Sequence, residues 1–494
     1  MKKIAKLTAV FLATVLLISG VGCGKKYQDA IIYFETPDKP ATADPQTAST
    51  VAELILASNT FEGLLRRNSS GAVVCGVSES YSRSGNEYTF VLKNNVKWSN
   101  GEPLTAHDFV FGFRRAVMPE TRSPFAKRLF CIENAEKINK GELQPDALGV
   151  TADGEYKLKI KLCYDDESFE ETLTTSVAMP CNEKFFEETG GRYGLAADSI
   201  ISCGSYKITK WTDDPFALRL KKNPEYSGTF PAKNAAVYIT KDKEKTAFER
   251  LRDNNVDISF IDSSLMNEAK ADKLLTAEYK NICWYLTMSD ELSAGLRRSF
   301  LMLTGSNVYA KDFAPGFYTA GSVFPPAVCQ TVISAGLTEY NAAAGKALYT
   351  AETSKLENGK LPSEIKLYYS NTDSAKPIIT DIVGHWQNNL GAYINIIAAD
   401  KPEALAEELK SKTLPMAVFP VTADSESLSE YAEKFGINYG GETEEQLQEK
   451  ILKLSNVLPI AYQSTVIAYS EALSDVFTEL GNGYIDFSFI VKTD

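Results

Sequence analysis

The chain has 494 residues, which is enough for two or three domains with complete cores. Its hydrophobic content of 44% and charged content of 23% are ordinary for a soluble globular protein. A formal charge of -12 argues against a nucleic-acid-binding protein, which needs basic surface to neutralise phosphates. We therefore expect no nucleic-acid partner.

The N-terminus has the composition of an export signal. Three lysines precede an uncharged, mostly apolar run of 16 residues from Leu7 to Gly22, which is short for a membrane span. Gly22 followed by Cys23 resembles a bacterial lipobox, although Gly20 stands where Leu is usual. We expect residues 1–22 to be removed and Cys23 to be lipidated. The alternative is an ordinary secretory signal followed by a coincidental cysteine.

The other cysteines carry no metal-binding pattern. The chain has eight cysteines, seven of them after Cys23, and their spacing contains neither C-x-x-C nor a zinc-ligand pattern. Most are expected to be small buried residues. Cys181 and Cys203 lie near predicted domain junctions and are candidates for a disulfide.

The first part of the chain predicts short strands around one helix. Residues 31–34 form a short apolar run typical of a buried strand, and residues 51–65 carry apolar side chains at helical spacing. Residues 87–98 and 154–164 are predicted as further strands, and the first alternates between apolar and polar side chains, as half-buried strands do.

Residues 97–119 predict a turn followed by a capped helix. Asn100-Gly101 supplies the turn, because both residues reach positive φ at low cost. Thr105 and Asp108 form a capping-box pattern with Asp in place of Glu. Phe109, Phe113 and Val117 follow at a spacing of four residues, which places them on one face of the helix. Nothing in this segment requires chemistry.

After about residue 178 the chain alternates between short strands and helices. The predicted strands are 204–211, 216–226, 364–370, 393–400 and 458–470, and the predicted helices are 375–392 and 443–457, with a short helix in 245–260 that leads into a strand at Ile258. Helix 375–392 lies between two strands, and this order predicts a βαβ unit with a parallel pair.

The sequence offers little for catalysis. It contains only two histidines, His107 and His385, and no hydrolase, metalloprotease or phosphate-loop motif. Both histidines are expected to serve packing or surface roles. We therefore expect neither an enzyme, nor a cofactor, nor a metal site. An exported, aromatic-rich body with several domains and no catalytic motif is typical of a ligand-binding receptor.

Five segments, in order, resemble the family 5 extracellular solute-binding proteins, the oligopeptide- and dipeptide-binding receptors of ABC importers. The segments are 43–65, 87–117, 123–129, 203–226 and 365–396. In the second segment the matching residues are Lys93, Trp98, Asn100, Gly101, Thr105, Ala106 and Asp108. Together the five segments span most of the chain.

This resemblance implies an α/β fold of the class C periplasmic-binding-protein-like kind (type II) with three lobes. It implies domain I at 24–61, 178–277 and 463–494, domain II at 62–177, and domain III at 278–462. The ligand would be enclosed between domains I and III by hinge closure, with crossings near residues 178 and 277. Peptides would lie extended and pair their backbone with protein strands.

The resemblance also implies a set of ligand-binding residues. Asp424 matches the family aspartate that pairs with the α-amino group of a peptide. The other implied contacts are Ser49, Thr50, Val51, Phe125 and Val421. Two of these depart from the family pattern, because Val421 replaces an aromatic residue and Phe125 replaces a tyrosine. The class of ligand is therefore less constrained than the family, and it could be a peptide or another small solute.

The expected partners follow from the family and the leader. We expect a monomer that is held at the outer face of the cytoplasmic membrane by its lipid anchor alone and that delivers its solute to an ABC-transporter permease. The alternative is a receptor-like or signalling lipoprotein of the same fold that binds a non-peptide solute without transport. A hydrolase is the least favoured reading.

Overall fold

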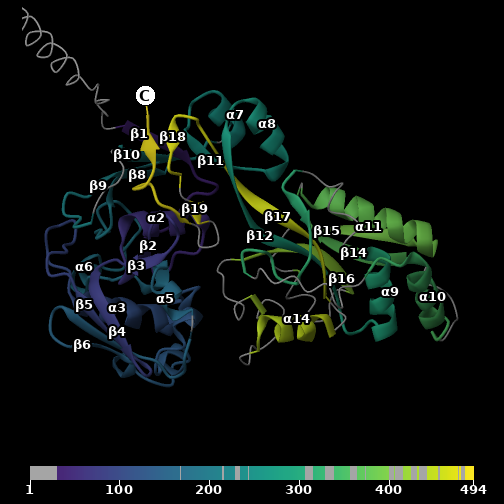
Figure 1. Cartoon of the computed structure of the whole chain (residues 1–494), viewed down its shortest axis with the longest axis horizontal. Coiled ribbons are helices and arrows are strands. Elements are labelled where there is room, and N and C mark those ends of the chain that lie inside the picture. Colours follow the sequence, from purple (N-terminus) through teal and green to yellow (C-terminus); the bar gives the residue numbers. More distant parts are fainter. Residues whose placement is uncertain are drawn as a thin grey trace, which may run out of the picture.

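The computed structural model describes residues 30–493 except 167, 214–215, 229–233, 243, 306–314, 329–338, 357–363, 373, 400–404, 406–414, 424–430, 433–441, 454–456, 477 and 480–483. The described chain forms two bodies joined by long strands (Figure 1). We call the body that contains the N-terminal strand the first lobe and the other the second lobe. No described helix is long and apolar enough to cross a bilayer.

One sheet runs through both lobes. Its strands are β1 (Ala30–Glu35), β8 (Tyr206–Asp213), β9 (Phe216–Lys222), β10 (Asn234–Thr240), β11 (Ile258–Ile261), β12 (Leu275–Met288), β13 (Phe317–Thr319), β14 (Glu364–Ser370), β15 (Tyr393–Ala399), β16 (Met416–Thr422) and β17 (Val457–Tyr469). They are ordered β15-β14-β16-β12-β17-β11-β1-β10-β9-β8, and β13 also pairs with β17. The strands predicted at 31–34, 204–211, 216–226, 364–370, 393–400 and 458–470 are confirmed.

The first lobe adds helices and small sheets to its half of this sheet. Its further elements are α2 (Val51–Thr60), β2 (Leu65–Arg67), β3 (Val73–Cys75), β4 (Ser78–Ser84), β5 (Glu87–Leu92), α3 (Ala106–Val117), α4 (Ala135–Asn139), β6 (Val150–Ala152), β7 (Lys157–Lys161), α5 (Phe169–Thr172), α6 (Glu183–Glu188), α7 (Ala247–Arg252), α8 (Met266–Ala271), β18 (Leu473–Ser474), β19 (Thr478–Glu479), β20 (Tyr484–Ile485) and β21 (Val491–Lys492). Strands β4-β5-β7-β6 form a four-stranded sheet. Short 3-10 turns lie at 119–121, 126–129, 145–147, 176–178 and 263–265.

The capped helix predicted at 105–117 is confirmed as α3. The Asp108 carboxylate accepts hydrogen bonds from the backbone N–H of Thr105 at 2.7 Å and from its hydroxyl at 3.1 Å. Gly101 has φ of 91°, as the predicted turn requires. The predicted apolar face of α3 is fully buried in the core of the first lobe: Phe109, Phe113 and Val117.

The helix predicted from residue 51 ends earlier than its apolar spacing suggested. Phe61 is extended at φ of -121° and ψ of 162°, and the chain then forms strand β2. A Cβ on Gly63 would lie 2.7 Å from the carbonyl oxygen of Leu173, so the backbone is packed too tightly here for another residue. Leu64 and Leu65 are buried in the same core without being helical.

The second lobe contains the predicted βαβ unit. Strands β14 and β15 pair in parallel, and α11 (Ala375–Leu390) connects them. The face of α11 predicted from its spacing is buried: Ile378, Ile382, Trp386 and Leu390. The lobe also contains α9 (Ala294–Thr304), α10 (Ala342–Thr353) and the predicted α14 (Glu444–Lys453). Two core clusters lie in this lobe, separate from the core of the first.

The proposed disulfide between Cys181 and Cys203 is wrong. Both thiols are free and buried. The sulfur of Cys181 accepts a hydrogen bond from Arg115 at 3.4 Å, and the sulfur of Cys203 lies 3.4 Å from the backbone nitrogen of Glu62. Each thiol therefore packs against a different part of the first lobe. Burial raises the pKa of the Cys203 thiol.

Candidate ligand-binding site

The segment before α2 is anchored to the helical part of the first lobe. The Arg115 guanidinium of α3 donates to both carboxylate oxygens of Asp44, at 2.7 and 3.2 Å, and to the side chain of Gln46 at 2.7 Å. The Gln46 amide donates to the carbonyl of Met179 at 2.8 Å. All of these side chains are buried, so the anchor is rigid.

Ser49, Thr50 and Val51 follow this anchor directly. Thr50 is the N-cap of α2, and the carboxylate of Glu53 accepts from the backbone N–H groups of Ser49 at 2.9 Å and Thr50 at 3.1 Å. Ser49 and Val51 are nevertheless exposed, with Val51 at 36%. The anchored loop therefore presents these two residues to solvent at the start of a buried helix.

The other predicted contacts lie apart from this segment. Phe125 is half-buried beside the core of the first lobe, with the Arg128 guanidinium 4.2 Å from its ring. Val421 lies in the second lobe on β16, paired with Cys283 of β12, and its side chain belongs to the core there. Its carbonyl accepts from the Tyr431 hydroxyl at 3.3 Å. Asp424 and Cys23 lie outside the described residues.

The two lobes meet where β12 and β17 pass from one to the other. Near their first-lobe ends Leu275–Tyr279 pair with Thr465–Tyr469, and further on Ile282–Thr287 pair with Val457–Gln463. The pairing is interrupted by two irregularities, between Tyr279 and Ile282 and between Trp284 and Tyr285. β-Bulges of this kind bend strands and increase their local twist.

A polar network surrounds the first irregularity. The Gln463 side chain accepts from the Trp284 indole at 2.8 Å and donates to the hydroxyls of Ser374 at 2.9 Å and Ser263 at 3.4 Å. Ser374 lies at the start of α11 in the second lobe, whereas Ser263 follows β11 of the first. Gln463 therefore connects both lobes.

A second set of contacts lies along the same crossing. The Tyr318 hydroxyl donates to the Glu278 carboxylate, and the Lys280 ammonium lies 3.7 Å from the Tyr318 ring centre. The Thr465 hydroxyl donates to the Asn281 side chain at 2.8 Å. Sequence reasoning missed these residues, although the polar run Gln463-Ser464-Thr465 inside an apolar strand was a visible signal.

Two of the family-like sequence segments meet in the first lobe. Glu62 of segment 43–65 accepts a hydrogen bond from the hydroxyl of Tyr226, the last residue of segment 203–226. These residues line a small cavity together with Arg66 and Asp486. Burial raises the pKa of Glu62 and of Asp486 above their ordinary values, although Arg66 opposes both shifts. The cluster joins distant parts of the lobe. Among the described residues, no group of three or more His, Cys, Asp or Glu side chains could hold a metal ion.

Comparison with known proteins identifies the family. The model of the "Bacterial extracellular solute-binding proteins, family 5 Middle" matches residues 73–442. The dipeptide-binding protein of Lactococcus lactis is 32% identical over 224 residues, which cover 44% of this chain but only 41% of that protein. The periplasmic oligopeptide-binding protein OppA of Salmonella typhimurium is 24% identical over 414 residues, which cover 79% of this chain and 74% of that protein.

Solved structures agree on the fold. The OppA structure from Burkholderia pseudomallei superposes with a TM-score of 0.76 at 17% identity and covers 94% of this chain and all 100% of its own. The predicted fold class, an α/β protein of the type II periplasmic-binding kind, is confirmed; the first lobe contains the described residues predicted for both domain I and domain II. Because the family model matches three quarters of the sequence, the chain belongs to the family 5 bacterial extracellular solute-binding proteins.

Proposed function

We propose that this protein captures peptides between its two lobes outside the cytoplasm and delivers them to the permease of an ABC importer. One observation carries the proposal: two lobes with separate cores are joined through strands whose pairing is interrupted at the crossing. Such a joint suits hinge closure around a ligand. Family members are extracellular or periplasmic receptors rather than enzymes.

The choice of peptide rests on the relatives and on the predicted residues. The two curated relatives are named for binding dipeptides and oligopeptides. In our proposal the exposed Ser49–Val51 segment and the end of β16 approach the ligand from opposite lobes. An extended peptide that adds to protein strands gains main-chain hydrogen bonds that are independent of its sequence.

Asp424 is proposed to pair with the peptide α-amino group. It follows β16 by two residues, and the family resemblance assigns it this role. A desolvated ammonium needs a charged partner and hydrogen bonds, and the α-amino group is present in every unblocked peptide. One carboxylate can therefore recognise the class of ligand without reading its sequence.

The experiment begins with mass spectrometry of ligands that co-purify with the native protein. Calorimetry then compares wild type and Asp424→Asn with a free peptide and its N-acetylated form. Loss of a buried charge pair should weaken binding of the free peptide by roughly 2–5 kcal/mol and change binding of the acetylated peptide little. Asp272→Asn, at an exposed carboxylate after α8, is the control.

The outcomes separate the alternatives. Equal affinity of wild type and Asp424→Asn for the free peptide would show that Asp424 is not the anchor. Recovery of a non-peptide solute, with no peptide binding, would favour the receptor-like lipoprotein without peptide transport. Lipid anchoring through Cys23 is a separate part of the proposal, with its own test below.

A further inference from the structure

One face of the first lobe carries a row of unneutralised cations. It is the solvent-facing side of β1, β10, β9 and β8, whose inward side chains fill the core. Across these strands Tyr33 pairs with Tyr238, Tyr238 with Arg219, and Arg219 with Lys210. One row further along, Lys221 pairs with Lys207. We call Lys207, Lys210, Arg219, Lys221, Tyr33 and Tyr238 the basic face.

The cations of the basic face are accessible. Lys210 and Lys221 are exposed, whereas Lys207 and Arg219 are half-buried. Within the described part of the chain, none of these four cations forms an ion pair, unlike many other surface lysines. Four adjacent, uncompensated cations are notable in a chain whose formal charge is -12.

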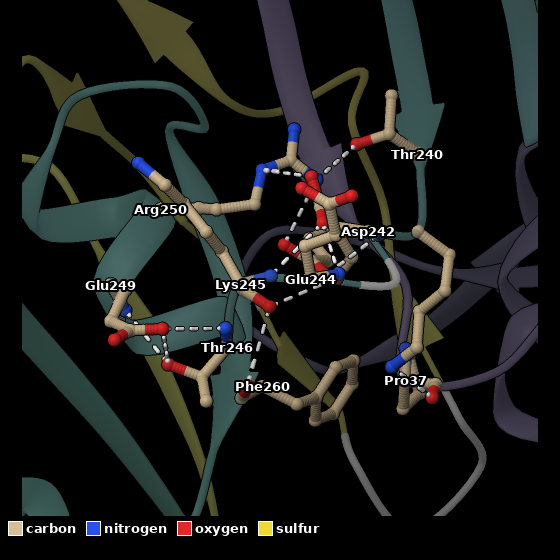
Figure 2. Close-up of polar contacts among 12 residues, drawn as sticks. Pro37, Thr240, Asp242, Glu244, Lys245, Thr246, Glu249, Arg250 and Phe260 are labelled. Atoms are coloured by element: carbon tan, nitrogen blue, oxygen red, sulfur yellow. Dashed lines mark hydrogen bonds and ion pairs between the residues drawn. The ribbon is translucent and has the colours of Figure 1, made fainter. Parts of the chain in front are cut away.

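Two of the acids beside this face are already neutralised. Asp257 pairs with Lys492 at 2.8 Å, and the buried Glu35 pairs with Arg250 at 3.1 Å. The Arg250 guanidinium of α7 also donates to the Thr240 hydroxyl at 3.2 Å and lies 3.8 Å from the Asp242 carboxylate (Figure 2). The four cations of the basic face, unpaired among the described residues, therefore favour an anionic partner.

Two tyrosines lie among these cations. The rings of Tyr33 and Tyr238 stack with centres 5.4 Å apart, and Tyr33 is 40% exposed. The Arg219 guanidinium lies 4.8 Å from the Tyr238 ring, and the Lys492 ammonium lies 5.5 Å from the Tyr33 ring. Tyrosine combines an apolar ring with a polar tip, which suits the boundary between lipid and water.

The position of this face in the chain indicates its partner. Strand β1 begins at Ala30, only seven residues after the predicted lipidation site at Cys23 (30 − 23 = 7). Seven residues span at most about 25 Å when fully extended. The start of β1 must therefore stay close to the membrane surface if Cys23 is anchored there, and Tyr33 of the basic face is three residues further on.

We propose that the basic face docks on the anionic lipid headgroups of the membrane and fixes the orientation of the first lobe on the bilayer. The placement of the basic face near the membrane rests on the lipid anchoring in the proposed function. Its attraction to anionic headgroups does not. The lysines would contact phosphates, and the tyrosine pair would lie at the level of the headgroups. Attraction of this kind is strongest near the surface and falls off within a Debye length.

The test uses residues 24–494, which contain every described element and need no lipid anchor. Binding to vesicles of phosphatidylglycerol and phosphatidylcholine is measured by co-sedimentation, with vesicles of phosphatidylcholine alone for comparison. The variant Lys207→Gln/Lys210→Gln/Lys221→Gln should bind the anionic vesicles roughly 100-fold more weakly, from about fivefold per lysine. Binding by wild type should weaken as salt is raised.

Two variants control for charge and for folding. Lys270→Gln/Lys346→Gln/Lys366→Gln removes the same charge from exposed lysines on α8, α10 and β14, and it should bind like wild type. Lys207→Arg/Lys210→Arg/Lys221→Arg keeps the charge and should also bind like wild type. Peptide affinity, measured in parallel, should be the same in all variants. A loss of vesicle binding therefore cannot be mistaken for a loss of peptide binding.

Two results would overturn the proposal. The first is equal binding of wild type to anionic and neutral vesicles, which would leave a protein such as the permease as the partner of this face. The second is an equal loss of binding in the two glutamine variants, which would show that only the total charge matters.

Discussion

Replacing Arg115 with methionine should destabilise the first lobe strongly. Arg115 is 5% exposed, and its guanidinium makes four polar contacts, to two oxygens of Asp44, to Gln46 and to Cys181. Its centre also lies 4.1 Å from the ring of Phe186. Methionine keeps much of the apolar packing but leaves the Asp44 carboxylate buried without its cation.

The size of the effect follows from that uncompensated charge. Removing one partner of a buried ion pair costs about 3–5 kcal/mol, whereas replacing both partners costs much less. In the variant the described groups that still donate to Asp44 include the backbone N–H of Gln46, at 3.1 Å, and this neutral contact cannot replace the guanidinium. Adding Asp44→Asn to Arg115→Met should therefore recover part of the lost stability.

Urea denaturation followed by circular dichroism measures the loss, and the first-lobe transition is compared between variants because the lobes can unfold separately. Arg83→Met is the matched control, since Arg83 pairs with Asp165 at the surface and should matter little. Peptide affinity should fall in Arg115→Met as well, because Ser49–Val51 follow the anchored loop. If Arg115→Met and Arg83→Met unfold at the same urea concentration, the reasoning is wrong.

Four further predictions concern other parts of the molecule. Cys23→Ala should release the protein from the membrane fraction of cells, and equally firm attachment of the variant would contradict lipidation. Trp386→Ala should destabilise the second lobe by roughly 3–5 kcal/mol in denaturation curves, because the indole is fully buried, packs 4.6 Å from the Phe300 ring and donates to Thr304. Burial raises the folded-state pKa of Glu62, so the stability of wild type relative to Glu62→Gln should fall as pH rises from about 4.5. Parallel pH profiles of the two proteins would contradict this. Small-angle scattering should show a smaller radius of gyration with saturating ligand, and an unchanged radius would count against hinge closure.

Local patterns in the sequence predicted the elements whose signals are also local. The cap at Thr105 and Asp108, the buried face of α3 and the βαβ unit around α11 all depend on spacings within about 35 residues, and each is confirmed. The end of α2 was misplaced because the tight packing of Gly63 against Leu173 joins residues 110 positions apart (173 − 63 = 110).

The predicted site depends even more on distant contacts. The loop before Ser49 is fixed by Arg115, which lies 71 residues after Asp44 in the chain. Val421 stands where the family usually has an aromatic residue. Its side chain is buried in the core of the second lobe rather than presented to solvent. No pattern around either position indicates these contacts. The domain bounds and the role of Asp424 therefore stay predictions from the family resemblance.

The polar run Gln463-Ser464-Thr465 lies where β17 crosses between the lobes, and its position there has a physical reason. Apolar side chains that interdigitate resist sliding, because a close-packed core has few alternative arrangements. In the proposed hinge closure, the hydrogen bonds from Gln463 to Ser374 and from Thr465 to Asn281 would instead be exchanged for others as the strands turn. Burying the Gln463 amide without partners would be costly, and the hydroxyls of Ser263 and Ser374 supply acceptors for it. The pairing of β12 with β17 is interrupted beside this network, and β-bulges bend strands, so the proposed hinge closure would turn the lobes at this point.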